Sequence, residues 1–348
     1  MAEAGLDAVI VASMPNIRYL TGFSGSSALV LVTAGAVVFL SDFRYRAQSQ
    51  DEVGELARII IEGGGLWDRL LKVLPEHPGV GRVAFEAEHL TARDAERLIE
   101  PSRPWRFVST VDLVESLRAI KAPEEVEAIR RAGTVATEAL AQATAQVRPG
   151  LTEFEVAALL EGALRRGGSE WYAFPTIVAS GPRSALPHAH TSGRVVGPGD
   201  LLLLDFGAVV DGYCSDVTRT FVVGAAPTTE QATIHGLVRQ AQQAALDGLR
   251  AGLTGRQGDA LARDVIAAGG HAEAFGHSLG HGVGLEVHEG PRLARMAEEV
   301  LPVAAVVTVE PGIYLEGWGG VRIEDDVVLR SGSAELLTEF SRELIRLG

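Results

Sequence analysis

The chain has 348 residues, 47% of them hydrophobic and 22% charged, which is enough for about two globular domains with sizeable cores. Its net charge of −14 argues against nucleic acid or an anionic membrane as a partner. The single cysteine, Cys214, excludes a disulfide framework and a cysteine-based zinc site, and no signal peptide or membrane-spanning run is recognisable, so we expect a cytoplasmic protein.

Residues 1–120 predict a small α/β domain. The segment 16–25 has the composition of a connecting loop. Arg44 and Arg46 follow a predicted strand, where a solvated helix start is the favoured interpretation and a contact with a substrate carboxylate is the alternative. The expected strands are 6–12, 28–33, 36–40 and 83–86, and the expected helices are 64–74 and 91–100.

A second domain is expected over residues 121–348. Pro123 suits the first position of a long helix, and Pro149-Gly150 ends it. Thr152 and Glu155 then form a capping box for a second helix, which stops at two glycines.

This helical segment is repeated. Residues 148–168 recur 102 residues later as residues 250–270, and a long helix precedes each copy. A histidine-bearing segment and an acidic pair of strands follow each copy, so we infer an internal duplication. The matching positions are Arg148, Gly150, Leu151, Thr152, Ala158, Leu159, Gly167 and Gly168 with Arg250, Gly252, Leu253, Thr254, Ala260, Leu261, Gly269 and Gly270.

The first acidic pair of strands lies in residues 200–222, where two apolar runs meet at Asp211-Gly212. Asp-Gly is typical of a type I′ hairpin turn. The hairpin places Asp205 and Asp216 diagonally on one face, roughly 7–8 Å apart or somewhat less. Four leucines precede Asp205, so its carboxylate is predicted to be buried and must be paired or bound to metal. The register pairs Val210 with Tyr213, Gly207 with Asp216 and Asp205 with Thr218.

The second acidic pair runs from residue 306 to residue 329. A turn centred on Gly317 places Glu310 directly opposite Glu324. A pseudo-twofold axis between the two copies would then gather four carboxylates around one cavity. Such a group needs roughly four positive charges of metal to balance it.

Histidines cluster in residues 187–190 and 276–289, close to both acidic pairs. One imidazole added to four carboxylates makes a site of nitrogen and oxygen ligands that suits Mn²⁺, Co²⁺, Fe²⁺ or Zn²⁺. The excess of carboxylates favours manganese.

These residues resemble a known family. Asp205, Asp216, His281, Glu310 and Glu324 are similar, in order and in neighbouring residues, to the dinuclear site of the pita-bread metallopeptidases. That superfamily includes methionine aminopeptidase, prolidase, aminopeptidase P and creatinase, and its fold is a duplicated α/β unit.

The resemblance is strongest to the proline-specific branch. The segments 216–220, 309–314 and 321–325 resemble that branch, and residues 16–23 and 42–45 resemble the creatinase-type N-terminal domain. Methionine aminopeptidases lack this domain, and creatinases lack the metal ligands. The implied fold class is therefore α/β (α+β), with a creatinase-like domain over 1–120 and a pita-bread catalytic domain over 121–348.

The resemblance also implies residue roles. His188 matches a histidine near the scissile carbonyl, His288 one that stabilises the tetrahedral intermediate, and His277 one that lines the proline pocket. Arg322 resembles an arginine close to the ligands. The candidate substrate-binding residues are His277, Arg322, Phe174 and Arg46, and the implied metal ligands are Asp205, Asp216, His281, Glu310 and Glu324, with two divalent ions, manganese first and Co²⁺ or Zn²⁺ as alternatives.

The implied activity is hydrolysis of Xaa-Pro bonds in small peptides, with Glu310 as general base and His288 donating to the oxyanion. A prolidase, which prefers dipeptides, is the favoured interpretation. An aminopeptidase P acting on longer peptides is the alternative, and a non-catalytic peptide-binding module on the same fold is a distant one. We also expect a homodimer.

Overall fold

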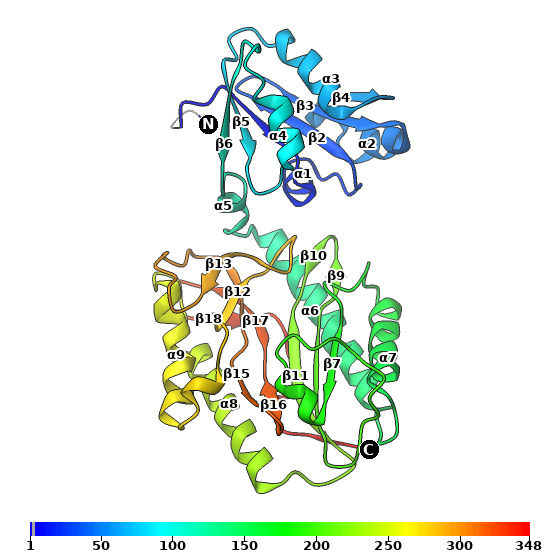
Figure 1. Ribbon diagram of the computed structural model, residues 1–348, viewed down its shortest axis with the longest axis vertical. Helices are drawn as coiled ribbons and strands as arrows, with labels where there is room; N and C mark the ends of the chain where they lie inside the picture. Colours follow the sequence, from blue (N-terminus) through cyan, green and yellow to red (C-terminus); the bar gives the residue numbers. More distant parts are fainter. Residues whose placement is uncertain (2–3) are drawn as a thin grey trace. The chain divides into compact units, whose positions relative to one another are not determined.

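A computed structural model describes residue 1 and residues 4–348 (Figure 1). The chain forms two compact units, Met1–Arg118 and Ala119–Gly348, which are taken one at a time below. Within the part of the chain that is described, no helix is both long enough and apolar enough to cross a membrane.

The N-terminal unit is a six-stranded mixed sheet with the strand order β4-β3-β2-β1-β5-β6. Alternate residues of its strands enter two separate apolar clusters, one on each face, which explains why these strands read as continuous apolar runs. The strands are β1 (Ala8–Val11), β2 (Ala28–Thr33), β3 (Val37–Asp42), β4 (Arg58–Glu62), β5 (Arg82–Glu86) and β6 (Arg106–Thr110). The helices are α1 (Met14–Thr21), α2 (Arg46–Glu52), α3 (Leu66–Val73), α4 (Ala92–Leu98) and α5 (Glu115–Arg118).

The predicted loop at 16–25 is wrong, because most of it is helix α1. Pro15 occupies the first turn, and Gly22, with φ of 75°, ends the helix in the left-handed conformation. The polar Asn16 is fully buried and donates to Glu86 at 2.6 Å, a residue 70 positions away. Because the partner of Asn16 is so distant in the sequence, a buried polar residue at this position could not be expected, and the apolar spacing of a helix was not recognisable.

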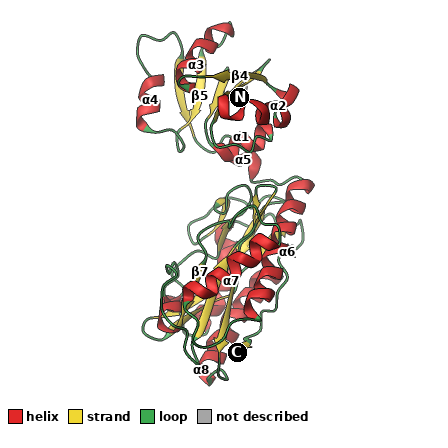
Figure 2. Cartoon of the chain, turned by 90° about the vertical axis from the view of Figure 1, so that its right-hand side faces the viewer, coloured by secondary structure: helices red, strands yellow, loops and turns green. Residues whose placement is uncertain are grey.

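The C-terminal unit has two helix pairs with strands between them (Figure 1), and one of these pairs faces the viewer in Figure 2. The first pair packs with β7, β8 and β11 in one apolar core, and the second pair packs with β13, β14 and β17 in another. The helices are α6 (Pro123–Thr144), α7 (Glu153–Arg166), α8 (Thr229–Gly248) and α9 (Gly255–Ala268). The strands are β7 (Ile177–Ser180), β8 (Leu201–Phe206), β9 (Val209–Val210), β10 (Tyr213–Cys214), β11 (Val217–Val223), β12 (Gly280–Gly282), β13 (Glu289–Leu293), β14 (Val306–Val309), β15 (Gly312–Leu315), β16 (Gly319–Arg322), β17 (Asp325–Leu329), β18 (Ala334–Leu336) and β19 (Arg346–Leu347).

The predicted duplication is confirmed by matching local details. Thr152 and Thr254 cap α7 and α9 in the same way, each with a complete capping box. Each threonine also makes an isolated antiparallel bridge, Thr152 to Val195 and Thr254 to Val300. The two copies therefore share the entry of the second helix and the isolated bridge beside it.

The two halves join along the strands that carry the acidic residues. Thr218 of β11 and Glu324 form an antiparallel bridge, and the Glu324 N–H donates to the Thr218 carbonyl at 3.1 Å. Thr220 exchanges two hydrogen bonds with the backbone of Arg322. This junction brings the first acidic pair against the second.

Candidate active site

The first acidic hairpin has the predicted register. Asp205 pairs with Thr218, and Val210 pairs with Tyr213 across the turn. Asp211 and Gly212 both have positive φ, 50° and 78°, as a type I′ turn requires. The side chains of Asp205 and Asp216 consequently lie on one face in the protein interior, 7% and 4% exposed.

The second acidic pair also has the predicted register. On one side Val309 pairs with Asp325, and on the other Gly312 pairs with Arg322. Both ladders place Glu310 opposite Glu324, at the point where neither ladder continues. The strands separate locally there, which leaves space for the two longer carboxylate side chains.

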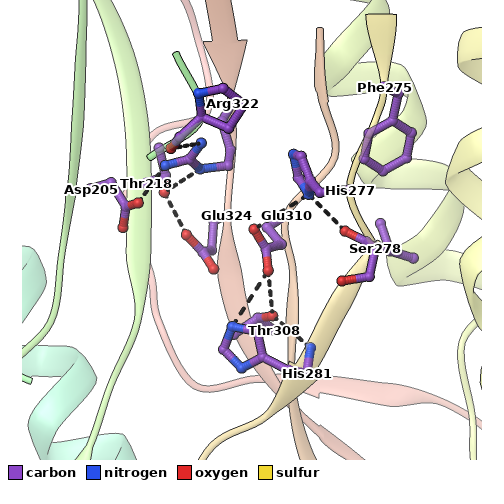
Figure 3. Close-up of polar contacts among 12 residues, drawn as sticks. Asp205, Thr218, Phe275, His277, Ser278, His281, Thr308, Glu310, Arg322 and Glu324 are labelled. Atoms are coloured by element: carbon purple, nitrogen blue, oxygen red, sulfur yellow. Dashed lines mark hydrogen bonds and ion pairs between the residues drawn. The ribbon is translucent and has the colours of Figure 1, made fainter. Parts of the chain in front are cut away.

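Two carboxylates and one imidazole lie close enough together to bind one cation. Asp216, His281 and Glu324 each offer one ligand atom, and these atoms all lie within 4.8 Å of one another. The His281 Nε2 atom lies 3.5 Å from Glu310 Oε1 and 3.8 Å from Asp216 Oδ2. Figure 3 shows His281 and Glu310 turned toward each other, with Glu324 beside Glu310.

Asp205 joins this cluster from the far side, through Arg322. The Arg322 Nη2 atom donates to Asp205 Oδ2, and Nε donates to Thr218 Oγ1 at 3.1 Å (Figure 3). Nη1 donates to Tyr314 Oη at 2.6 Å. The guanidinium is buried and fixed by these partners, so it holds Asp205 in place and balances part of its charge.

The cluster buries several carboxyl groups close together, and this disfavours their ionised forms. Burial, together with the charge of Glu324, raises the pKa of both Asp216 and Glu310 well above the usual range. Burial and Asp205 raise the pKa of Glu324 to about 8. Burial lowers the pKa of His281 to about 4, so its imidazole is neutral near pH 7, as a metal ligand must be.

The donor set fits divalent cations. Asp205 Oδ1 and Asp216 Oδ1 are buried and accept no hydrogen bond from residue 1 or residues 4–348. A buried carboxylate oxygen without a donor is costly unless a cation satisfies it. Carboxylate oxygens with one neutral imidazole are the ligands that manganese and similar divalent ions take.

The other predicted histidines surround the cluster. The rings of His288 and His281 meet edge to face with centroids 4.3 Å apart. His277 lies 2.9 Å from Tyr314 Oη through Nε2, and 3.9 Å from Glu310 through Nδ1. His188 is exposed, and its charge contributes to lowering the pKa of both His277 and His288, so it lies near them.

Comparison with known proteins identifies the family. Residues 127–331 match metallopeptidase family M24, and residues 1–120 match the creatinase/prolidase N-terminal domain.

The chain belongs to metallopeptidase family M24.

Similar proteins cover almost the whole M24 chain. It is 37% identical over 347 residues to an Xaa-Pro dipeptidase of Pyrococcus horikoshii, covering 99% of this chain and 96% of that one. Among solved structures, an Xaa-Pro dipeptidase from Bacillus anthracis is 41% identical with a TM-score of 0.95, covering 99% and 96% of the two chains. An X-Pro aminopeptidase from Thermotoga maritima is 38% identical with a TM-score of 0.92, covering 99% and 97%. The predicted creatinase-like and pita-bread folds are confirmed.

Two of the predicted substrate-binding residues have no hydrogen bond to the acidic cluster among the described residues. Phe174 is half-buried in the loop between α7 and β7. Arg46 is the first residue of α2 in the N-terminal unit. Both roles stay predictions.

Arg292 is a cation near the M24 cluster that sequence reasoning missed. It pairs directly with His281 across β12 and β13, and its charge contributes to lowering the pKa of His281 and His288. Its side chain is exposed, and no ion pair joins it to another described residue. A register shift between His281 and Gly282 sets this pairing, and that shift has no local sequence signal.

Proposed function

We propose that this M24 peptidase hydrolyses the bond before proline in Xaa-Pro peptides and uses two divalent ions, with manganese first and cobalt or zinc as alternatives. The observation that carries the proposal is the buried acidic cluster with its unsatisfied Asp205 and Asp216 oxygens and neutral His281. Full-length similarity to proteins named Xaa-Pro dipeptidase supports the choice of substrate. The proposed metal ligands are Asp205, Asp216, His281, Glu310 and Glu324.

The divalent ions would balance the buried charge, polarise the substrate carbonyl and lower the pKa of the attacking water. The chain's own groups supply the proton transfers. Glu310 has a pKa raised by burial and by Glu324, which suits a general base that works near neutral pH. After accepting the water proton, Glu310 can return it to the proline nitrogen, which must be protonated to leave.

Two histidines are proposed to act on the carbonyl oxygen. His288 lies against His281, at the edge of the cluster, where it can donate a hydrogen bond to the developing oxyanion. His188 is the second proposed donor, because its loop is fixed beside Arg322: the Arg322 Nη1 atom donates to the Pro187 carbonyl at 3.2 Å.

We propose a preference for dipeptides, which requires a fixed cation for the carboxylate of the prolyl residue. Arg183 is committed to Glu153, and Arg322 to Asp205 and Tyr314. Arg292 is exposed beside His281 and His288 and is therefore our first choice, with Arg46 as the alternative. Similarity to a protein named X-Pro aminopeptidase keeps longer peptides as the second candidate substrate class.

The test is an activity panel with Ala-Pro, Ala-Pro-Ala and Ala-Pro amide, each with Mn²⁺, Co²⁺ or Zn²⁺. We expect the fastest turnover on Ala-Pro with Mn²⁺.

Arg292→Gln should raise KM for Ala-Pro roughly tenfold, the scale of one charge-assisted contact, and leave KM for the amide unaffected. Faster cleavage of Ala-Pro-Ala would favour aminopeptidase P. Absence of bound metal and of activity would favour a peptide-binding module. The predicted homodimer is tested by light scattering of the same preparation.

A further inference from the structure

A second buried charge pair lies in the C-terminal unit, outside the acidic cluster. The Lys121 Nζ atom is 2.6 Å from Glu289 Oε1, and the two side chains are only 1% and 5% exposed. A buried ion pair adds little stability compared with an apolar pair of the same size, yet removing one partner is expensive. No step of the proposed mechanism uses either residue, so another reason for the pair is needed.

Glu289 closes the turn that carries His288. This turn covers residues 283–288, between β12 and β13, and Glu289 follows His288 directly. The Glu289 carboxylate lies inside the turn, because a Cβ placed on Gly284 would be 2.5 Å from Glu289 Oε1. Its Oε2 accepts a long hydrogen bond from the Glu286 N–H at 3.5 Å. The turn is therefore built around this carboxylate.

Lys121 reaches the turn from a fixed position. Its N–H donates to the Ala304 carbonyl at 3.1 Å, and α6 begins two residues later. Val126 and Ile129 of α6 pack in one apolar cluster with Val283 of the turn. The Lys121 backbone is thus fixed just before α6, and its side chain is buried.

We propose that Lys121 and Glu289 are positioning residues that hold His288 against His281 in the geometry needed for hydrolysis. The inference rests on the proposed function, in which His288 donates to the oxyanion. Without the Lys121 ammonium, the Glu289 carboxylate loses the cation that lies 2.6 Å away, which favours its movement toward water or its protonation. Either change alters the turn next to His288. His281 is also held on its other side, by its N–H bond to Thr308 Oγ1 at 3.1 Å and by the pairing of β12 with β14, so metal binding should persist.

The test measures kcat, KM and bound manganese for full-length Lys121→Met, Glu289→Gln and His288→Ala. Displacing an oxyanion donor should lower kcat by roughly 10- to 100-fold, less than the 10²–10³-fold typical of deleting one. KM and manganese content should change by less than about twofold. Lys72→Met is the matched control, because Lys72 is the chain's other lysine and is exposed on α3.

The decisive comparison is the double variant Lys121→Met with His288→Ala. If Lys121 acts through His288, Lys121→Met should lower kcat no further in the His288→Ala background. An equal further loss, or an unchanged kcat in both single variants, would overturn the inference. Glu289→Gln keeps the side-chain size and tests the same step if Lys121→Met fails to fold. A wild-type enzyme inactive on Xaa-Pro peptides would overturn the proposed function itself.

Discussion

The two halves of the C-terminal unit share one scaffold and contribute differently to one site. In the first half, the acidic residues are the short Asp205 and Asp216. Asp205 lies inside the β8–β11 ladder, whereas Asp216 lies at the break between this ladder and the β9–β10 pair. In the second half, the ladders break at Glu310 and Glu324. The break between ladders therefore carries both glutamates in the second half but only one of the two aspartates in the first. A duplicated fold thus carries an asymmetric site.

Each half also buries an acid in its second helix that fastens a loop. Glu153 of α7 accepts N–H groups of Ser180 and Ser192, at 2.9 and 3.0 Å. Asp259 of α9 accepts the Leu279 N–H at 3.0 Å, two residues before His281. The same device occurs in both halves: the loop of the first half carries His188, beside the cluster, and the loop of the second half leads to His281 within it. A buried acid of the scaffold thus fixes a histidine-bearing loop in each half.

The largest expected effect comes from removing one carboxylate of either half. Asp216→Ala and Glu310→Ala should each lower Ala-Pro hydrolysis by at least about 10³-fold, because each half supplies an essential part of one centre. Circular dichroism should show an unchanged fold. Glu316→Ala, in the exposed turn of the second half, is the control. Near-wild-type rates in both variants would remove the site assignment.

The junction between the halves should be the most sensitive point for stability. Arg219 of β11 is buried and donates to the Glu324 carbonyl at 2.6 Å and to Asp325 at 2.7 Å. Arg219→Met should cost roughly 3–5 kcal/mol in urea unfolding, because it strips a buried carboxylate of its main partner. Arg342, 3.3 Å from the same carboxylate and partly exposed, gives the matched variant, with a smaller loss. Equal losses would contradict this assignment.

Metal removal should give the joined halves a characteristic pH dependence. Between about pH 6.5 and 8, the folded state keeps a proton on Glu324, whose pKa is raised to about 8, while the unfolded state has lost it. The unfolded state then binds fewer protons, so the stability of the metal-free protein falls as pH rises, and Glu324 alone contributes up to about 2 kcal/mol to this fall. Histidines such as His281, with a pKa lowered to about 4, oppose this trend only below pH 6.5. Thermal melts after chelation measure it, and Mn²⁺ should abolish the fall. A rising stability in this window would argue against the buried acidic cluster.

The smallest effects test the equivalence of the halves directly. Thr152→Ala and Thr254→Ala each remove an N-cap whose hydroxyl accepts the N–H three residues on, so each should cost about 1 kcal/mol, with values within about 0.5 kcal/mol of each other. Chemical denaturation of both variants measures this. A large difference would mean that the two copies have diverged in how they stabilise the fold.

Much of the site could be predicted from the sequence because local signals fix the registers. The Asp211-Gly212 turn and the turn centred on Gly317 determine which carboxylates face each other, and the structure has both registers. The repeat and its caps predicted the helix pairs. Local signals cannot reveal contacts between distant segments. The Arg322–Asp205 pair joins residues 117 positions apart, and Arg292 reaches His281 only through a strand irregularity. Helix α1 was missed for the same reason, because the partner of Asn16 lies on another strand.

The C-terminal strand β19 has a consequence for the solution behaviour of shortened chains. Arg346 and Leu347 pair in parallel with Val222 and Val223 of β11, at the far end of the strand that leads from Asp216. β19 thereby covers one margin of that sheet, whose order is β19-β11-β8-β7. Removing residues 346–348 would leave a row of unpaired backbone groups on apolar residues, which another chain can pair with. We therefore expect such a truncation to self-associate before it loses activity.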